Sequence, residues 1–281
     1  MSYSDLLRAV VANQKEALLL DQYPGAVSAH SLRYLLSSYT GNVILVRRSS
    51  DDSEAGFTPT EITDGTLEAF CGAGDGFVKT LYDQVENYDF SQTTQSRQPK
   101  IVDSGTLIEN NGFPSMQFSG GQFIGIASPT IFTSAMSVFN VAQVTNTGSE
   151  TRAWVFHNSG SPAFFLHRCY TNNNSIRAYL NDGGAKELSF PYSTWNDIHI
   201  FYMTAVSNDY MEAVVNNQTL QSKSIGNFSA STGNNFGLGA GRLQTNNSIT
   251  GHIFETISYN SDESANASGI IEGLNNHYGV F

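Results

Sequence analysis

The chain has 281 residues, of which 40% are hydrophobic and 14% are charged, and its formal net charge is −11. A chain of this length and apolar content can bury a core without disulfides or a structural metal, and it is not intrinsically disordered. The acidic balance without a basic patch argues against a nucleic-acid partner. No apolar run reaches the ~20 residues that a membrane helix needs, so we expect no membrane partner. The opening, MSYSDLLRAV, lacks a secretion-signal pattern, and we do not expect export by the usual route.

The first 40 residues predict two helices. Apolar residues recur with near-helical spacing after Ser4, which can cap a helix, and Pro24-Gly25 ends the pattern. Residues 26–39 predict a second short helix. We interpret residues 1–24 as a helical attachment segment that precedes a domain at 25–281; the alternative is that this helix packs back on its own domain. The residues expected to contact a second copy or a virion partner are Leu6, Leu7, Val10, Val11 and Leu18.

Further along the chain the pattern changes to short strands. Residues 43–48 predict a strand, and a short helix, a glycine-rich turn and another strand are predicted up to Tyr82. From residue 100 onward, Asn- and Gly-rich turns separate strand candidates, and a final helix is predicted at Glu263–His277. This pattern indicates a two-sheet sandwich or barrel and argues against a parallel α/β fold. The strand candidates are Lys100–Val102, Ser115–Phe118, Ser137–Val144, Ala153–His157, Ala163–Cys169, Ser175–Leu180, Asp197–Val206, Asp209–Val215, Gln218–Ser224, Asn235–Gly239 and Thr250–Tyr259.

Several blocks of the sequence resemble known proteins. Ser31–Asp52, Ala69–Gln84 and Arg97–Gly105 resemble the opening of concanavalin A-like jelly rolls, which is shared with the catalytic domain of α-L-arabinofuranosidase B. The segment Trp195–Ser222 is similar to central strands of that jelly roll, and Glu255–Phe281 resembles the ending of laminin-G-like virion proteins of tailed bacteriophages. The resemblance implies an all-β fold: a concanavalin A-like jelly-roll sandwich with short N-terminal and C-terminal helices.

The same resemblance implies a virion structural protein that forms a fibre, a tail appendage or a capsid decoration. It would be located in the virion as a homo-oligomer, and its partners would be other virion proteins and host-surface glycans. On this interpretation the chain is not an enzyme. Two alternatives remain open, because one fold hosts many functions: an arabinofuranosidase-like glycoside hydrolase, and a cellular lectin-like adhesion module.

Possible catalytic groups follow from the arabinofuranosidase resemblance. Met211-Glu212-Ala213 is similar to a nucleophile context of that family. Retaining glycosidases need a second carboxyl group about 5–5.5 Å from the nucleophile, and the sequence shows no recognisable partner acid. We therefore expect no catalytic residue and interpret Glu212 as an ordinary strand residue. Asp83-Gln84 is interpreted as a pair that satisfies loop amides at the end of a strand.

The six histidines and the two cysteines, Cys71 and Cys169, show no metal-ligand spacing. We expect buried free thiols, no metal and no cofactor. Two alternatives remain: a zinc site where His157 and His167 meet across a hairpin, and a calcium site that uses the loop residues Asp182, Asp197 and Asp209.

A glycan site would combine aromatic rings, on which sugars stack, with amide side chains that exchange hydrogen bonds with hydroxyls. The candidates are Trp154, Tyr170, Asn172, Asn173, Tyr192 and Trp195.

Overall fold

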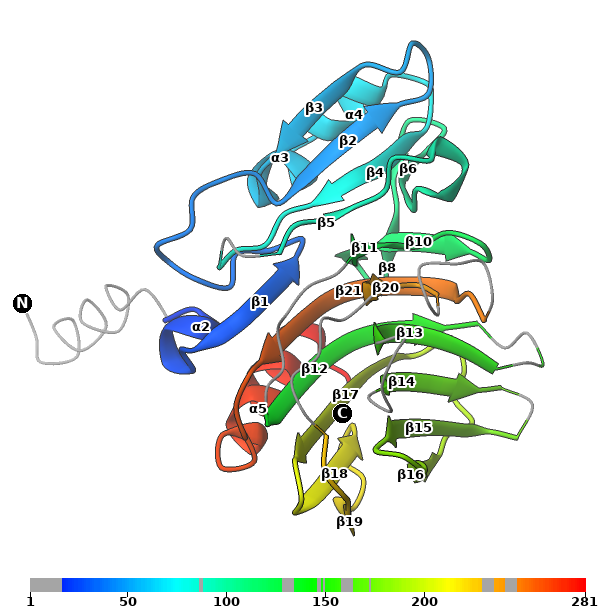
Figure 1. Ribbon diagram of the computed structural model, residues 1–281. Helices are drawn as coiled ribbons and strands as arrows, with labels where there is room; N and C mark the ends of the chain where they lie inside the picture. The colour runs from blue at the N-terminus through cyan, green and yellow to red at the C-terminus, as the bar shows by residue number, and fades with distance from the viewer. Residues whose placement is uncertain are drawn as a thin grey trace, which may run out of the picture.

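Two antiparallel layers of strands face each other, and a smaller lobe of strands and short helices sits at one end (Figure 1). This computed structural model describes residues 17–85, 88–127, 134–145, 148, 150–157, 164–171, 173–228, 235–240 and 247–281. The architecture confirms the predicted all-β, concanavalin A-like jelly-roll sandwich.

The first layer is built around the long strand β21. Its hydrogen-bonded order is β19, β18, β17, β12 and β21, and strands β1 and β10 share the far edge of β21. The bounds are β19 Gln221–Ser224, β18 Tyr210–Val215, β17 Ile198–Val206, β12 Ala135–Val144, β21 Thr250–Tyr259, β1 Ala26–Ser31 and β10 Met116–Ser119.

The second layer runs in the order β11, β20, β13, β14, β15 and β16. Its bounds are β11 Ile124–Ala127, β20 Asn235–Leu238, β13 Glu150–His157, β14 Phe164–Tyr170, β15 Ser175–Asn181 and β16 Ala185–Pro191.

The lobe joins the two layers, since β6 pairs with β10 and β5 pairs with β11. It holds β2 Ile44–Arg48, β3 Glu54–Phe57, α3 Pro59–Thr63, α4 Thr66–Cys71, β4 Gly76–Leu81, β5 Phe90–Ser91, the 3-10 helix η1 Gln95–Arg97, β6 Lys100–Asp103 and β7 Thr106–Leu107. The hairpin of β8 Glu109–Asn110 and β9 Phe113–Pro114 follows it, and α2 Leu19–Gln22 and α5 Ala267–Tyr278 complete the described elements.

Side-chain alternation along β17 divides the core into two parts. His199, Phe201 and Met203 are buried on one side of the strand, and Ile200 and Tyr202 on the other. The first set faces the second layer of strands, where the main apolar cluster lies. The second set belongs to a cluster that includes α5. Apolar residues on both faces of this segment are therefore those of a central strand covered on both sides.

The predicted strands from residue 100 onward all correspond to observed strands, and Asn216 follows β18 with a φ of +52°, which suits the predicted turn. The final helix is also confirmed, although it begins at Ala267. The prediction of a helix at 26–39 is wrong, because residues 26–31 form β1 and pair with β21. Pairing with an available strand edge outweighs the local helical pattern.

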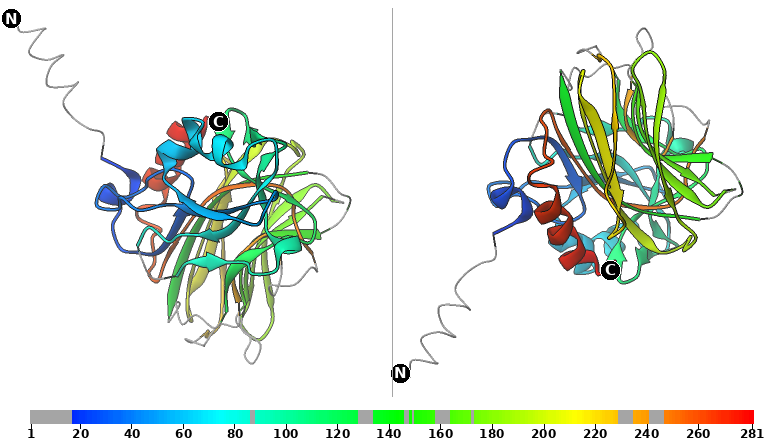
Figure 2. Two further views of the ribbon diagram at one scale, coloured as in Figure 1. Left: turned by 90° about the horizontal axis from the view of Figure 1, so that it is seen from above. Right: turned by 90° about the horizontal axis from the view of Figure 1, so that it is seen from below.

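The start of the described chain packs on the sandwich. Leu19 and Leu20 of α2 are buried in the same cluster as α5, and the two helices lie side by side in both views of Figure 2. Leu18 is half-buried. The remaining predicted contact residues, Leu6, Leu7, Val10 and Val11, lie outside the described residues, so a separate attachment segment at 1–24 stays a prediction. Among the described helices, none is both long and apolar enough to span a bilayer.

Candidate functional site

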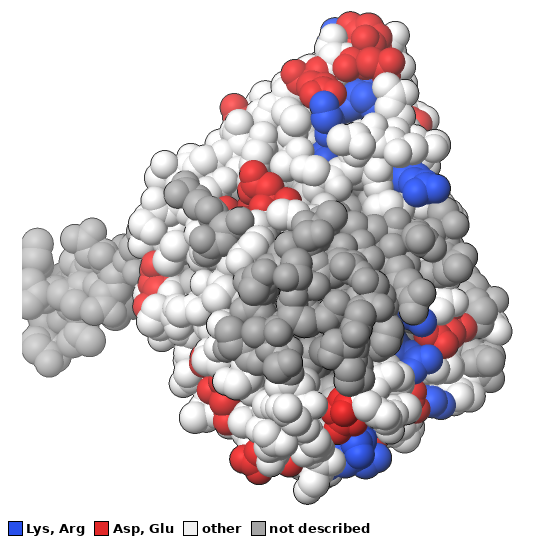
Figure 3. Space-filling view, viewed as in Figure 1, with Lys and Arg blue, Asp and Glu red and all other residues white. Residues whose placement is uncertain are grey.

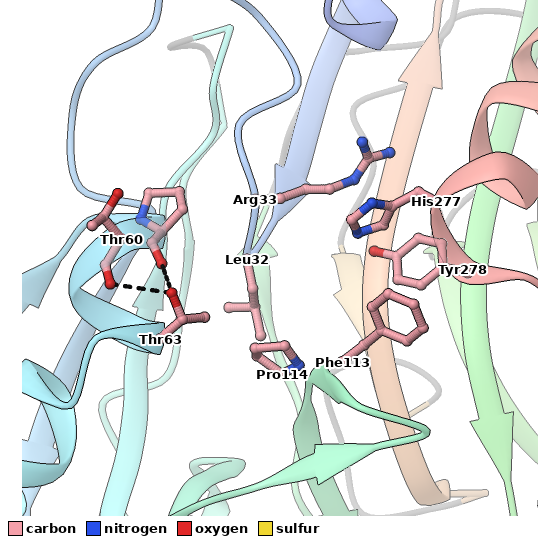
Figure 4. Close-up of a pocket in the computed structure, with 9 residues that line it drawn as sticks. Leu32, Arg33, Thr60, Thr63, Phe113, Pro114, His277 and Tyr278 are labelled. Atoms are coloured by element: carbon pink, nitrogen blue, oxygen red, sulfur yellow. Dashed lines mark hydrogen bonds between the residues drawn. The ribbon is translucent and has the colours of Figure 1, made fainter.

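A groove of about 340 Å³ lies between the lobe and the C-terminal end of α5 (Figure 4). Its two walls differ in chemistry. Thr60 and Thr63 of α3 stand on one side, and Phe113, His277 and Tyr278 stand on the other. Leu32, Arg33, Pro59 and Pro114 complete the lining. A concave site with apolar and aromatic walls and a few polar groups is the usual form of a small-ligand site.

The wall of the groove that carries Arg33 and Tyr278 is held rigidly by the buried carboxylate of Glu255. Arg33 donates to both of its oxygens, from Nε at 2.8 Å and from Nη2 at 3.1 Å. Ser31 Oγ and the Tyr278 hydroxyl each donate to Oε2 at 3.0 Å. Glu255 lies on β21 with 1% of its surface exposed, so β1, β21 and α5 are tied together at one point. The Arg33 guanidinium and the Tyr278 ring are therefore presented in fixed positions.

The protonation states in the groove follow from burial and from Glu255. Burial opposes the charge on Arg33, but Glu255 and Tyr278 outweigh that effect and raise the guanidinium pKa. Burial and then the Glu255 charge raise the pKa of Tyr278 well above its usual value, so its hydroxyl stays protonated. Burial, with Arg33 nearby, lowers the pKa of His277 to about 4. At neutral pH the groove therefore holds a neutral imidazole, a phenol and a guanidinium that is neutralised by Glu255.

The aromatic wall is an interlocked set of rings. Phe113 meets Tyr278 edge-on at 5.1 Å between ring centroids and His277 at 5.2 Å. These residues come from the β8–β9 hairpin and from the last turn of α5, which are far apart in the sequence. Sequence reasoning missed Arg33, Phe113 and His277, because nothing local in the sequence places these segments together.

A second constellation brings two carboxyl groups near each other on the outer face of the first layer. Glu212 of β18 accepts a hydrogen bond from the Tyr202 hydroxyl at 3.0 Å. Asp262, in the loop after β21, accepts one from the Tyr210 hydroxyl at 2.8 Å. Burial, and the nearby charge of Asp262, raise the pKa of Glu212, although the Tyr202 hydrogen bond opposes this. The loop 260–262 therefore supplies an acid near Glu212 that no sequence motif indicated, and the expectation that Glu212 is not catalytic stays a prediction.

The predicted glycan residues do not gather at one exposed surface. Trp154 is completely buried against Phe236, so its ring offers no face to a ligand. Tyr192 and Trp195 are also buried, and the Trp195 indole donates to Asn174. Their burial has a simple cause: in a sandwich, large rings fill the space between the layers.

The other two predicted positions that the structure describes are more open. Tyr170 is half-buried, and the guanidinium groups of Arg168 and Arg177 lie over its ring at 4.9 and 4.0 Å. Asn173 is exposed. Asn172 lies outside the described residues. A glycan role for Tyr170 and Asn173 stays a prediction.

Asp83 and Gln84 have the structural role that was predicted. Asp83 accepts from the backbone amides of Ala29, Val85 and Tyr88. Gln84 accepts from the amide of Leu35. Both are buried and tie β1 to the lobe.

Cations and acids lie next to each other on the face shown in Figure 3, at the tip of the lobe and at the lower edge of the sandwich. At the tip, Arg48 pairs with Asp51 at 2.7 Å. On the second layer, Arg168 pairs with Glu150 and Glu187, each at 2.8 Å. Positive charge at these places is locally neutralised.

No model of a known protein family matches the chain, and no curated protein matches it in sequence. Solved structures match it in fold. A mutant of a GH54 α-L-arabinofuranosidase soaked with 4-nitrophenyl α-L-arabinofuranoside superposes with a TM-score of 0.65 at 14% identity. An arabinofuranosidase complexed with arabinofuranosyl-α-1,2-xylobiose superposes with a TM-score of 0.57 at 15% identity. Each alignment covers 91% of this chain, which spans 64% of the length of the matched enzyme.

These matches show that the chain has the fold of the arabinofuranosidase β-sandwich. The expectation that the chain is not an enzyme is wrong as an inference from its fold, because three solved structures that share this fold over 91% of the chain are arabinofuranosidases, which are enzymes. They also bear out the resemblance to the arabinofuranosidase opening. These structures are not virion proteins, so the assignment of the chain to a virion stays a prediction.

Proposed function

We propose that the protein binds a neutral glycan in the groove between α3, β9 and the end of α5. One observation carries the proposal: three rings and the Arg33 side chain line one wall of a groove of about 340 Å³, and Thr60 and Thr63 line the other. The Thr63 hydroxyl donates to the carbonyls of Pro59 and Thr60, so it offers a ligand an acceptor. Sugars offer C–H faces that pack on rings and hydroxyls that exchange hydrogen bonds, and both partners are present here.

The charge balance of the groove favours a neutral sugar over an acidic one. Arg33 is the one formally charged side chain among its described lining residues, and Glu255 already holds it in a two-point ion pair. His277 is uncharged at neutral pH. An anionic sugar would therefore gain little net attraction. The shared fold makes arabinose-containing oligosaccharides the first ligands to test.

Calorimetric titration with neutral arabinose-containing oligosaccharides tests this proposal. We expect binding by the wild type and a loss of about tenfold in affinity in Phe113→Ala, which corresponds to about 1.4 kcal/mol. Phe281→Ala is the matched control, because Phe281 is exposed and does not line the groove. Unchanged affinity in Phe113→Ala, or tighter binding of acidic than of neutral sugars, would contradict the proposal.

A second candidate function is glycoside hydrolysis at Glu212 and Asp262. The favouring observation is the unlike environment of the two carboxyl groups: burial and Asp262 raise the pKa of Glu212, whereas the exposed Asp262 accepts hydrogen bonds from Tyr210 and from the Ser264 amide. Glycosidases use one protonated and one ionised carboxyl group in this way. Glu212 would be the general acid, and Asp262 would be the second carboxyl group.

Release of nitrophenol from 4-nitrophenyl α-L-arabinofuranoside tests this candidate. We expect turnover by the wild type and a fall of about 10²-fold or more in Glu212→Gln and in Asp262→Asn. Glu272→Gln, at an exposed position of α5, is the control. Equal rates in the wild type and in Glu212→Gln would exclude this site.

Location in a virion, with other virion proteins as partners, stays a prediction from the sequence resemblance alone. Cryo-electron microscopy or mass spectrometry of purified particles would test it directly. Absence of the chain from purified particles would refute it.

A further inference from the structure

Between the two layers lies a cluster of metal-binding side chains that takes no part in the groove or in the carboxyl pair. His167 and Cys169 are two residues apart on β14, so both point to the same side of that strand. His199 reaches them from β17 in the opposite layer. All three are buried, and their ligand atoms lie within 4.8 Å of one another.

The separations are those of atoms that share one metal ion. Nε2 of His167 lies 3.1 Å from Nε2 of His199 and 3.5 Å from Sγ of Cys169. Tetrahedral bonds of ordinary zinc length place two imidazole nitrogens about 3.3 Å apart and a nitrogen and a sulfur about 3.5 Å apart. The third side of the triangle, between Cys169 and His199, is no longer than 4.8 Å.

The surrounding residues orient His167 for this role. Asn140 donates its amide nitrogen to the Glu255 carbonyl, so its oxygen faces the ring and accepts from Nδ1 of His167 at 2.9 Å. That bond leaves the Nε2 lone pair directed at Cys169 and His199. Phe201 stacks on the His167 ring at 4.1 Å and fixes its plane. Metal-bound histidines are characteristically held by such a second hydrogen bond.

His199 directs Nε2 at His167, whereas its Nδ1, on the other side of the ring, is buried and has no hydrogen-bond partner among the described residues. Two imidazoles and a thiolate are a donor set that suits zinc and copper and does not suit calcium or magnesium.

We propose that His167, Cys169 and His199 form a buried site for one transition-metal ion of the zinc–copper class. The ion would replace the Cys169 thiol proton, which leaves to solvent, and would join the two layers of the sandwich through β14 and β17. This proposal is an alternative to the expectation of no metal site. It also differs from the alternative pairing of His157 with His167, because the strand register places Trp154, and not His157, opposite His167.

The first test is the metal content of the untagged full chain, purified without chelator from medium that contains zinc and copper. We expect about one equivalent of zinc or copper per chain. We expect Cys169→Ser and His199→Gln to lose it. Cys71→Ser is the matched control, because Cys71 is also a buried free cysteine but lies outside the cluster. Asn140→Leu, which keeps the three ligands but removes the orienting hydrogen bond together with the one to the Glu255 carbonyl, should weaken metal affinity by about 10- to 100-fold.

The second test does not depend on how the variants fold. The wild type is refolded with Co²⁺, and a thiolate-to-cobalt charge-transfer band is expected, together with a melting temperature that rises with free metal concentration. A folded wild type that purifies without zinc or copper and shows no such band would overturn the proposal. Metal that persists in Cys169→Ser and disappears in Cys71→Ser would overturn it as well.

Discussion

Substitution of Glu255 by glutamine tests the buried junction that positions the groove. The change keeps the size of the side chain but removes the charge that balances Arg33, and it leaves Ser31 and Tyr278 with a weaker acceptor. Breaking a buried ion pair by removing one partner costs about 3–5 kcal/mol. With the usual unfolding entropy per residue and 281 residues, this corresponds to a melting temperature that is about 5–8 °C lower.

Thermal unfolding followed by circular dichroism measures this shift. Glu272→Gln, at an exposed site of α5, should melt within about 1 °C of the wild type. The double variant Arg33→Met with Glu255→Leu should recover only part of the loss, because it leaves no unpaired buried charge but takes the acceptor from the buried Ser31 and Tyr278 hydroxyls. A melting temperature of Glu255→Gln within about 1 °C of the wild type would refute the reasoning that this carboxylate ties β1, β21 and α5 together.

Three further predictions concern packing, backbone conformation and pH. Trp154→Ala should lower the free energy of unfolding by about 3–5 kcal/mol in urea titrations, because it empties a fully buried site. Gly251→Ala should lower the melting temperature far more than Gly184→Ala, since φ at Gly251 is +145° and an added Cβ would overlap the Gln143 carbonyl, whereas Gly184 has open space. Burial in the folded protein lowers the pKa of His277 to about 4, so the unfolded chain binds a proton on this imidazole at a higher pH than the folded chain does. Acidification from about pH 6.5 to pH 4 therefore destabilises the fold. The melting temperature of His277→Gln should fall less over that range, and parallel pH profiles of the two proteins would contradict this.

Local patterns were sufficient to predict the fold class and most strands. The length of a strand, the alternation of its apolar and polar residues and the Asn- and Gly-rich turns that bound it are properties of short segments, and the folded chain keeps them. The segment 198–203 is an example: its apolar residues on both sides indicated a strand covered on both faces, and β17 is covered by the second layer on one side and by α5 on the other. The structural role of Asp83 and Gln84 was likewise readable from their place at the end of a strand.

Elements at a strand edge were harder to predict. Residues 26–31 carry a helical pattern, yet they form β1, because the edge of β21 offers hydrogen bonds that a short helix at this position could not replace. The partner strand lies more than 200 residues away, beyond the reach of any local pattern.

Both candidate sites and the metal cluster are products of tertiary structure. Arg33 and Tyr278 come from distant segments and are joined through Glu255 on β21, and the β8–β9 hairpin brings Phe113 against Tyr278. His167 and His199 lie in opposite layers and meet only when the sandwich closes. Local sequence determines the alternation of side chains along each strand and the positions of the turns. The pairing of side chains across the layers depends instead on strand register and on the packing of the two sheets. The sequence by itself therefore determined what kind of sandwich this chain forms, and only the tertiary structure decided which side chains share a site.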